Sequence, residues 1–557
     1  MNKNRNSTKK SAVSSKNQRK FANKHFSAEF RVDVAKLDSA RDSAKNVRDS
    51  AKDSAKNAKD STRDSAKKSA ESAKNAKDST RDSAKKSADS TKNMRDSTKL
   101  DSTQDSTKLS HKSPFKKRLK KYAKNSAIAL LYAFIFTLPI YANIFTYLSI
   151  DILNGKNGVF LPYLNTIFAL CAVASILKVD RKYRFYFGFW VGILWFYWMG
   201  MSFTHSYSSI MHFIPVALLL IGVIYGAVFY ILLFFNALLW RIFTLSVIGH
   251  IAIFGFDWMV VPALFSFSIF RVGAWSFIFI LFFVALCLHY YQKSRTAEKK
   301  DAKKRNFKRA IFALIPLIFV IDFSHIDVEV PPKIFISQMD VNQQIKWLEE
   351  TQIVSERNFA VIDEAIMRGD KMVILPETAF PFALNTFERI LQTLLEKSHQ
   401  ITIIAGAWHF ENDKSFNATY IFENGEVEIR NKTFLAPFGE YLPLPKFLSN
   451  IFSKITGLQY GLEEARGEIG NVDSAIFSFR NAICYEATKR EMYSDNPKYM
   501  VVISNNAWFA PSIQPVLQMM LIKYYARLYG TMVIHASNGS RSMVISPNTG
   551  VWLVEGV

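Results

Sequence analysis

Residues 475–486, AIFSFRNAICYE, form an apolar, β-rich run that ends near Cys484. This pattern predicts a buried strand with a thiol at its carboxyl end. Two charged side chains stand earlier in the chain: Glu377 directly follows the apolar run 372–376, and Lys432 lies in a later connection. A thiol, a carboxylate and an amine can serve as nucleophile, general base and charge stabiliser. Together these three residues indicate covalent acyl chemistry.

From residue 331 onward, short apolar runs alternate with longer amphipathic ones. The runs predicted as strands are Lys333–Gln338, Met372–Pro376, Ile401–Trp408, Ala418–Phe422, Ala475–Cys484, Tyr499–Asn505, Met532–Ser537 and Ser542–Ile545. The runs predicted as helices are 347–368, 386–399 and 514–530. Strand–helix–strand order followed by consecutive strands favours an α/β sandwich of sheets with helices on its outside. We expect this domain to cover residues 331–557.

Seven apolar segments precede that domain and predict a membrane domain of about seven transmembrane helices within residues 114–325. They are 126–148, 159–178, 186–204, 210–238, 243–263, 272–291 and 308–324. Lys and Arg gather in the connections 178–184 and 292–309 and are sparse in the alternate connections. Because basic connections face the cytoplasm, this pattern predicts a multi-pass protein of the bacterial inner membrane. The N-terminal tail would be cytoplasmic, and the domain after the last span periplasmic.

Residues 1–113 form a low-complexity tail rich in Lys, Asp, Ser and Ala. Residues 56–73, KNAKDSTRDSAKKSAESA, recur almost unchanged at 74–91. The period of 18 residues equals five helical turns and produces a stripe of Ala and Thr. Ala buries little area, however, and Ser and Asp compete with helical hydrogen bonds. We therefore expect disorder or a solvated helix, as a repeat expansion without chemistry or as a charged cytoplasmic tether.

The composition excludes several classes of function. The 557-residue chain has a formal net charge of +24, but this charge lies in the tail and between apolar runs. A nucleic-acid-binding domain would instead show a basic face interleaved with aromatic residues, so we expect no nucleic-acid partner. Cys171 and Cys287 lie in apolar segments, which leaves Cys484 as a free thiol. The scattered histidines, such as His409 and His535, lack the spacing of metal ligands, and we expect neither a metal nor a cofactor.

Each candidate residue also has an ordinary structural explanation. A cysteine at a strand end is usually a small core residue, a glutamate after proline usually lies in a turn, and a lysine in a polar connection is usually solvated. Their joint occurrence favours a catalytic role. Glu377 would accept the thiol proton, and Lys432 would stabilise negative charge, first on the thiolate and then on a tetrahedral oxyanion. The backbone N–H of Tyr485 would be a second oxyanion donor.

The motifs around these residues closely resemble those of the nitrilase superfamily, whose members use a Glu-Lys-Cys triad in this order. The matching stretches are Ile374–Pro381 (ILPETAFP), Asn431–Thr433 (NKT), Pro437–Pro443 (PFGEYLP), Cys484–Glu486 (CYE) and Ser504–Phe509 (SNNAWF). The preceding apolar segments narrow the resemblance to the family of apolipoprotein N-acyltransferases. It covers roughly residues 115–557 and implies a nitrilase-like α-β-β-α sandwich joined to a helical membrane bundle.

The resemblance implies a two-step reaction without a cofactor. Cys484 would take a fatty acyl chain from a membrane phospholipid as a thioester and pass it to the α-amine of a diacylglyceryl apolipoprotein. Glu440 would support Glu377, and Glu486 would order the loop that carries the nucleophile. The family's substrate-contacting positions correspond to Gln338, Trp347, Phe438, Gly439 and Trp508. The partners implied are the donor lipid, the apolipoprotein and the bilayer, and we expect a monomer.

Three further features of the sequence bear on this interpretation. The apolar spacing within 444–458 predicts an amphipathic helix, which either dips into the outer leaflet or packs on the domain. Family members usually close with another strand and an eighth membrane helix. This chain stops at Val557, so we expect those elements to be missing. Asn506 stands where the family pattern leads us to expect aspartate.

Two other functions remain open at this level. The first is a membrane-tethered amidohydrolase of the nitrilase type, in which water resolves the thioester. It would need a polar pocket open to solvent. The second is an inactive membrane scaffold, for which the charged tail would be the interaction surface. It predicts that Cys484→Ala leaves function intact.

Overall fold

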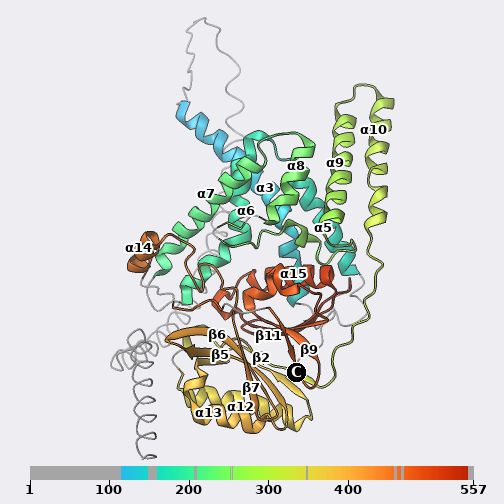
Figure 1. Cartoon of the computed structure of the whole chain (residues 1–557). Helices are drawn as coiled ribbons and strands as arrows, with labels where there is room; N and C mark the ends of the chain where they lie inside the picture. The colour runs from blue at the N-terminus through green and yellow to red at the C-terminus, as the bar shows by residue number, and fades with distance from the viewer. Residues whose placement is uncertain are drawn as a thin grey trace, which may run out of the picture. The chain divides into compact units, whose positions relative to one another are not determined.

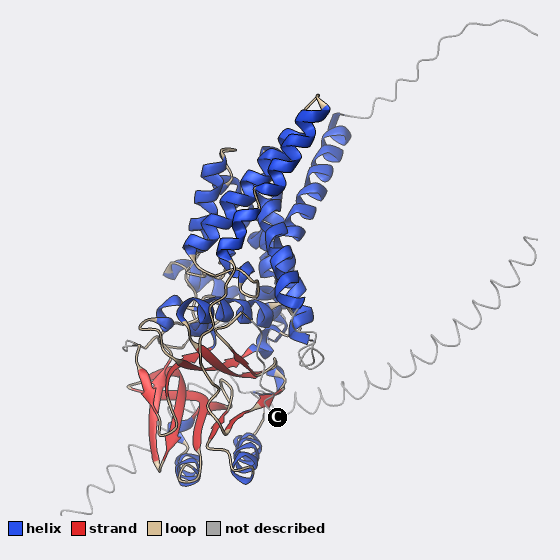
Figure 2. Ribbon diagram, turned by 90° about the vertical axis from the view of Figure 1, so that its right-hand side faces the viewer, coloured by secondary structure: helices blue, strands red, loops and turns tan. Residues whose placement is uncertain are grey.

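The structure is a computed structural model that describes residues 114–148, 160–205, 210–250, 252–253, 255–346, 349–456, 461–465 and 469–549. The predicted repeat tail and Trp347 lie outside these described residues. Residues 112–557 form one compact unit. Within it, most helices gather at one end, and the strands lie at the other end together with further helices (Figure 2).

Two six-stranded sheets lie face to face in the region after residue 331. The first contains β1 (Ile334–Ile336), β3 (Met372–Ile374), β4 (Phe380–Ala383), β5 (Thr402–Glu411), β6 (Lys414–Glu423) and β7 (Glu426–Asn431). The second contains β2 (Gln338–Met339), β8 (Asn471–Asp473), β9 (Ser478–Ile483), β10 (Tyr499–Asn505), β11 (Met532–Asn538) and β12 (Met543–Ile545). Strands β1, β3 and β5 run parallel, as do β9, β10 and β11. Parallel strands that are covered on both faces need continuous apolar runs, and the sequence shows such runs there.

Alternation of side chains along each strand builds three apolar layers. Ile374 and Ile503 point between the sheets, whereas Val373 points outward from the first sheet. Helices α12 (Thr351–Met367) and α13 (Glu388–Lys397) cover that outer face. Helix α15 (Gln514–Tyr529) covers the outer face of the second sheet (Figure 1). The fold is therefore the α-β-β-α sandwich expected from the sequence.

The membrane domain is a bundle of helices, most of them apolar; α10 is rich in Lys and Arg. Its main helices are α3 (Pro114–Leu148), α5 (Phe160–Leu177), α6 (Arg184–Phe196), α7 (Ile214–Leu232), α8 (Leu238–Val247), α9 (Ala274–Thr296) and α10 (Lys300–Phe312). Among the described residues, three helices are long and apolar enough to cross a membrane. A fourth span results if the pair 161–177 and 181–204, which is bent by 101°, counts as one.

Four of the seven segments predicted as spans differ in the structure, since 159–178 and 186–204 form the bent pair that counts as one span at most. The other two are 243–263 and 308–324. Segment 243–263 holds the end of α8 and two short 3-10 helices, because Gly249, Gly255 and Pro262 interrupt the helical pattern. Segment 308–324 holds the end of α10, which begins earlier than expected at Lys300. A 3-10 helix follows, in which Pro316 has no N–H to continue the α-helical ladder.

Candidate active site

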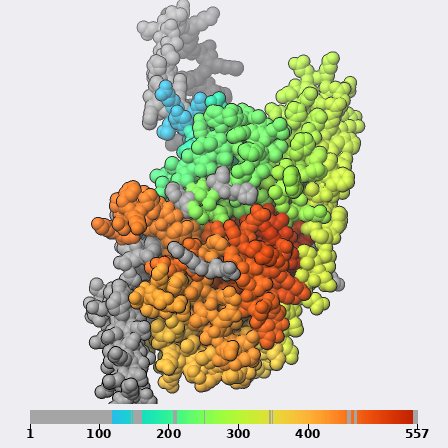
Figure 3. Space-filling model, viewed as in Figure 1, coloured from blue at the N-terminus to red at the C-terminus, as the bar shows by residue number. Residues whose placement is uncertain are grey.

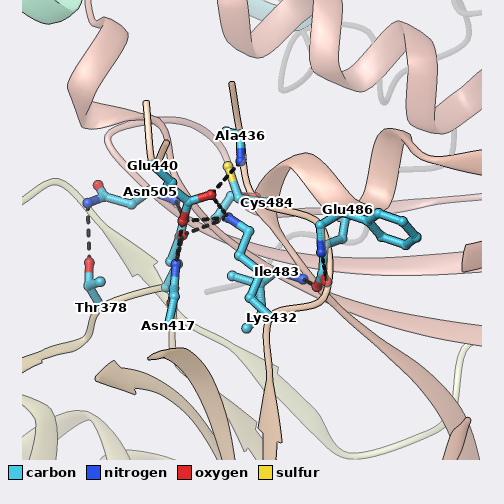
Figure 4. A network of polar contacts seen from close by, with 12 residues as sticks. Thr378, Asn417, Lys432, Ala436, Glu440, Ile483, Cys484, Glu486 and Asn505 are labelled. Atoms are coloured by element: carbon cyan, nitrogen blue, oxygen red, sulfur yellow. Dashed lines mark hydrogen bonds and ion pairs between the residues drawn. The ribbon is translucent and has the colours of Figure 1, made fainter. Parts of the chain in front are cut away.

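Glu377, Lys432 and Cys484 come together in one polar cluster, although they follow strands of two different sheets. Figure 4 shows Lys432 and Cys484 of this cluster beside Glu440 and Asn417. Glu377 lies just beyond β3, Lys432 directly follows β7 and Cys484 directly follows β9. The Lys432 Nζ lies 3.6 Å from Oε1 of Glu377. Glu377 and Lys432 are buried, whereas Cys484 keeps part of its surface exposed. The cluster therefore sets a reachable thiol beside a buried ion pair.

The position of Glu377 depends on close packing of backbone. Strand β3 ends at Ile374, and the turn Pro376–Thr378 that follows crosses Gly406 of β5. A Cβ at position 406 would lie 2.6 Å from the Cα of Glu377, so only glycine fits there. The carboxylate accepts hydrogen bonds from Asn417 Nδ2 at 2.7 Å and from the Asn505 backbone N–H at 2.8 Å. These two donors fix both of its oxygens.

The backbone at Cys484 is held in an uncommon conformation. Its φ of +52° lies in the left-handed region, where a non-glycine residue is strained. The residue turns the chain from β9 into the 3-10 helix η8 (Cys484–Thr488). Burial raises the pKa of the Cys484 thiol to about 12, and Glu377 adds to this effect while Lys432 opposes it. The thiol is therefore protonated at neutral pH and needs a base to become a nucleophile.

Lys432 is held as a cation by two carboxylates. Its Nζ donates to Glu440 Oε1 at 2.9 Å and lies 2.8 Å from Glu440 Oε2. Burial by itself lowers the pKa of Lys432, but Glu440 and Glu377 outweigh burial and raise it above the ordinary value. The backbone N–H of Ala436 also donates to Glu440, which ties this carboxylate to its own loop. A permanent positive charge thus faces the thiol.

Glu486 joins the loop after Lys432 to the turn at Cys484. Its Oε1 accepts from the backbone N–H groups of Thr433 at 2.6 Å and Phe434 at 3.1 Å. Its Oε2 accepts from the N–H of Ile483 at 2.8 Å. Burial raises the pKa of Glu486 to about 7, although Lys432 and these three donors favour the charged form. The side chain reaches no reacting atom and acts on the geometry of the site.

Tyr485 connects the turn at Cys484 to the membrane domain. Its hydroxyl donates to Asp257 Oδ1 at 2.7 Å, and its ring stacks on Phe256. Lys489 lies 2.8 Å from the other carboxylate oxygen of Asp257. A short segment before the last membrane helices therefore supports the residue that follows Cys484.

The residues predicted to contact substrate do not all lie in one place in the structure. Phe438 and Gly439 form the tight turn that carries Glu440, with Phe438 at a φ of +63°. Trp508 lies in the 3-10 helix η10 (Asn506–Phe509) that follows β10. Gln338 is exposed and hydrogen-bonds to Ser540 and Ser542 instead of the catalytic cluster. Trp347 lies outside the described residues.

Sequence reasoning missed several polar residues of the site. Asn417 of β6 bridges Glu377 and Glu440, with an Nδ2 distance of 3.0 Å to Glu440 Oε1. Lys346 is buried and donates to Thr378 Oγ1 at 2.8 Å, and burial lowers the pKa of this lysine to about 7. Asn417 directly precedes the predicted strand Ala418–Phe422, among polar residues, so no local signal marked it. Within the described residues, no group of three or more His, Cys, Asp or Glu side chains has the arrangement of a metal site.

Comparison with known proteins gives matches for both parts of the chain. The family model of the apolipoprotein N-acyltransferase integral membrane domain matches residues 123–299, and that of the carbon-nitrogen hydrolases matches residues 338–552. The chain is 37% identical over 429 residues to an apolipoprotein N-acyltransferase of Wolinella succinogenes, covering 76% of this chain and 96% of the relative. The relative from Helicobacter hepaticus is 36% identical over 409 residues, covering 71% of this chain and 97% of that protein. The Helicobacter pylori relative is 32% identical over 430 residues, covering 75% and 95%.

Proposed function

The chain belongs to the apolipoprotein N-acyltransferase family, and from this premise we propose that it transfers the acyl chain through a thioester on Cys484. The chain is an acyltransferase with an integral membrane domain and a carbon-nitrogen hydrolase domain. One observation carries the proposal: the thiol of Cys484 lies in the same cluster as the ion pair of Lys432 with Glu377. A nucleophile, a base and an oxyanion partner are the groups that acyl transfer needs.

In the first step the acyl chain moves from a glycerophospholipid to the enzyme. Glu377 accepts the proton of Cys484, and the thiolate attacks the ester carbonyl carbon. The oxyanion that forms is stabilised by Lys432 and by the backbone N–H of Tyr485. The carbon–oxygen bond to glycerol then breaks, and the leaving oxygen takes the proton from Glu377. The products are a lysophospholipid and the acyl thioester.

In the second step the apolipoprotein accepts the chain, so the reaction is of the ping-pong type. The α-amine of the diacylglyceryl cysteine attacks the thioester carbonyl carbon, and Glu377 removes a proton from that nitrogen. Glu440 holds Lys432 in place during both steps through its two oxygens. The carbon–sulfur bond breaks, the amide forms, and the thiolate recovers its proton from Glu377. The second step thus restores the resting enzyme.

The membrane domain fits a bacterial inner membrane, and we assign the catalytic domain to its periplasmic side. The basic connection between α9 and α10 is the support for this orientation, because such connections stay in the cytoplasm. In spheroplasts of a Cys171→Ala, Cys287→Ala, Cys484→Ala background, an impermeant maleimide should label a Gln352→Cys variant. It should not label a Lys299→Cys variant. Labelling of Lys299→Cys alone would reverse the orientation.

Helix α14 (Lys446–Thr456) supplies a possible contact with the lipid surface. Phe447 and Ile451 are 64% and 51% exposed on one apolar face. Figure 3 shows this part of the chain, in orange, projecting from the surface. Apolar side chains presented in this way suit the interface of a bilayer, with Lys446 and Lys454 near the head groups. We assign α14 to the outer leaflet, next to the donor lipid.

Complementation of a conditional strain that lacks this acyltransferase tests the whole proposal. The wild-type chain should restore growth, and Cys484→Ala should not. Mass spectrometry of the purified chain with phospholipid alone should find a stable acyl adduct on Cys484. Rapid release of free fatty acid would favour the hydrolase, and growth with Cys484→Ala would exclude the thioester.

A further inference from the structure

A chain of three buried side-chain amides ends at the nucleophile. Gln514 Nε2 donates to Asn506 Oδ1 at 3.1 Å, and Asn506 Nδ2 donates to Gln518 Oε1 at 2.8 Å. Gln518 Nε2 then lies 3.7 Å from Cys484 Sγ, within hydrogen-bonding range for sulfur. Each amide accepts from the one before it and donates to the next. The last donor of the series points at the sulfur that forms the thioester.

The hydrogen bonds around Gln518 all fit one orientation of its amide group. Both of its hydrogens have acceptors, Cys484 Sγ and the Ser504 Oγ at 3.3 Å, and its oxygen receives the Asn506 donor. With Asn506 in place, rotation by 180° would set the Gln518 nitrogen against the Asn506 nitrogen. The residue is fully buried, so water cannot compensate for the hydrogen bond lost between them.

Asn506 is the residue that fixes this direction. An asparagine carries both an acceptor for Gln514 and a donor for Gln518. An aspartate carboxylate would only accept, so it could receive Gln514 but could not donate to Gln518 Oε1. The amide chain therefore explains why asparagine suits position 506 in this sequence.

We propose that Gln518 is a catalytic residue that donates a hydrogen bond to Sγ of Cys484, with Asn506 as the positioning residue that aims it. The inference rests on the proposed function, in which Cys484 is the nucleophile. The sulfur becomes negative twice, when Glu377 removes its proton and when the thioester breaks. A neutral donor stabilises that charge at both moments. It also adds no positive charge that would compete with Lys432 for the carboxylates.

Modification of Cys484 by iodoacetamide tests the donor without any substrate. The full-length chain in detergent is treated at pH 8, and the Cys484 and Cys171 peptides are quantified by mass spectrometry. The ratio of their rates removes differences in reagent and protein quality. The variants are Gln518→Leu, which removes the donor, and Asn506→Asp, which reverses the Gln518 amide at nearly constant volume. Gln352→Leu, on the exposed side of α12, is the matched control.

Loss of the donor should raise the thiol pKa by about one to two units, since hydrogen bonds to charged groups have that strength. Each unit reduces the thiolate tenfold, and the greater nucleophilicity of a more basic thiolate restores about threefold. We therefore expect the ratio of rates to fall about three- to tenfold in both variants and to stay constant in Gln352→Leu. The kcat for acyl transfer should fall in parallel, with little change in KM.

The outcomes separate this inference from the proposed function. Unchanged Cys484 modification in Asn506→Asp and Gln518→Leu would refute the donor role, whatever the activity of Cys484→Ala. A fall in Gln518→Leu alone, with Asn506→Asp unchanged, would refute the positioning role of Asn506. Acyl transfer by Cys484→Ala would overturn the proposed function instead. Size-exclusion profiles identify a variant that fails to fold. If Gln518→Leu fails to fold, the Cys484 modification rate of Asn506→Asp tests the donor role of Gln518.

Discussion

Replacement of Glu486 by glutamine should loosen the active site without changing its volume. The carboxylate accepts three backbone N–H groups, two from the loop after Lys432 and one from Ile483. A glutamine oxygen can keep the donors on one side only. Its NH2 group would then face an N–H donor on the other side. The substitution therefore separates the segment that carries Lys432 from the segment that carries Cys484.

The magnitude follows from the hydrogen bonds that are lost. A bond to a charged group contributes about 1.5–3 kcal/mol, and an unsatisfied buried donor costs about 1–3 kcal/mol. Because the carboxylate holds a local structure, the effect should appear as local opening. A change of about 1.4–3 kcal/mol corresponds to about 10- to 100-fold faster amide exchange at Thr433, Phe434 or Ile483.

Hydrogen–deuterium exchange with mass spectrometry measures this directly in peptides that cover 430–436 and 480–486. Glu423→Gln is the matched control, because Glu423 also accepts a backbone N–H, that of Ala475. Its other partner, the Thr402 hydroxyl, can rotate to accept from the new amide, so exchange there should stay nearly constant. Unchanged exchange in both active-site peptides of Glu486→Gln would refute the assigned role of Glu486.

Three further predictions follow from single contacts. Gly406→Ala should push Glu377 out of place, at a cost of about 1–3 kcal/mol, and kinetics should find a lower kcat with similar KM; full activity would show that Glu377 is not the base. Asp257→Asn should remove a coupling free energy of about 1.5 kcal/mol between residue 257 and Lys489. A double-mutant cycle with Lys489→Met measures it from denaturant unfolding, and additive changes in the free energy of unfolding would contradict the prediction. Burial lowers the pKa of His535 to about 4, so below about pH 6.5 the unfolded chain binds a proton that the native protein does not. From pH 7 to pH 5, the free energy of unfolding of the wild-type chain should fall by about 2 kcal/mol more than that of His535→Gln. Pulse proteolysis in urea measures both, and an equal pH response in the two proteins would refute this.

The inner strands of the soluble domain were predictable because they are buried on both faces. The predicted strand Tyr499–Asn505 has the same bounds as β10, and Met532–Ser537 differs from β11 by one residue. Strands β7 and β8 were missed. They lie at sheet edges, and the sequence of β7, EVEIRN, has few apolar residues, so hydrophobic periodicity gave no signal. The boundaries in the membrane domain were less predictable, since apolar composition alone does not reveal that α8 ends at Val247 or that α10 ends at Phe312.

The residues of the candidate site differ in the same way: the local sequence reveals some of them, and only the tertiary structure reveals the others. Glu377 and Cys484 were found because each follows an apolar run, a pattern visible in one stretch of sequence. Asn417 and Gln518 were not found, because their amides matter only through partners far away in the chain. A buried amide inside a strand or helix has no local pattern that tells whether it reaches a solvent-filled gap or a nucleophile. Only the packed structure supplies that partner.

The high pKa of the Cys484 thiol is compatible with the nucleophile role that we propose for it, with Glu377 as the proposed base. The resting cluster contains the carboxylates of Glu377 and Glu440 and one ammonium group, that of Lys432, so its net charge already opposes a further anion. After burial, Glu377 contributes most to the increase of the thiol pKa to about 12. Transfer of the proton from sulfur to Glu377 removes that carboxylate charge as the thiolate charge appears. The net charge of the cluster stays constant, and Lys432, no longer facing Glu377 as an anion, is free to stabilise sulfur. In the proposed mechanism, a thiol that resists ionisation at rest would therefore become a nucleophile only when Glu377 is aligned to take its proton, and the cysteine would be protected between turnovers.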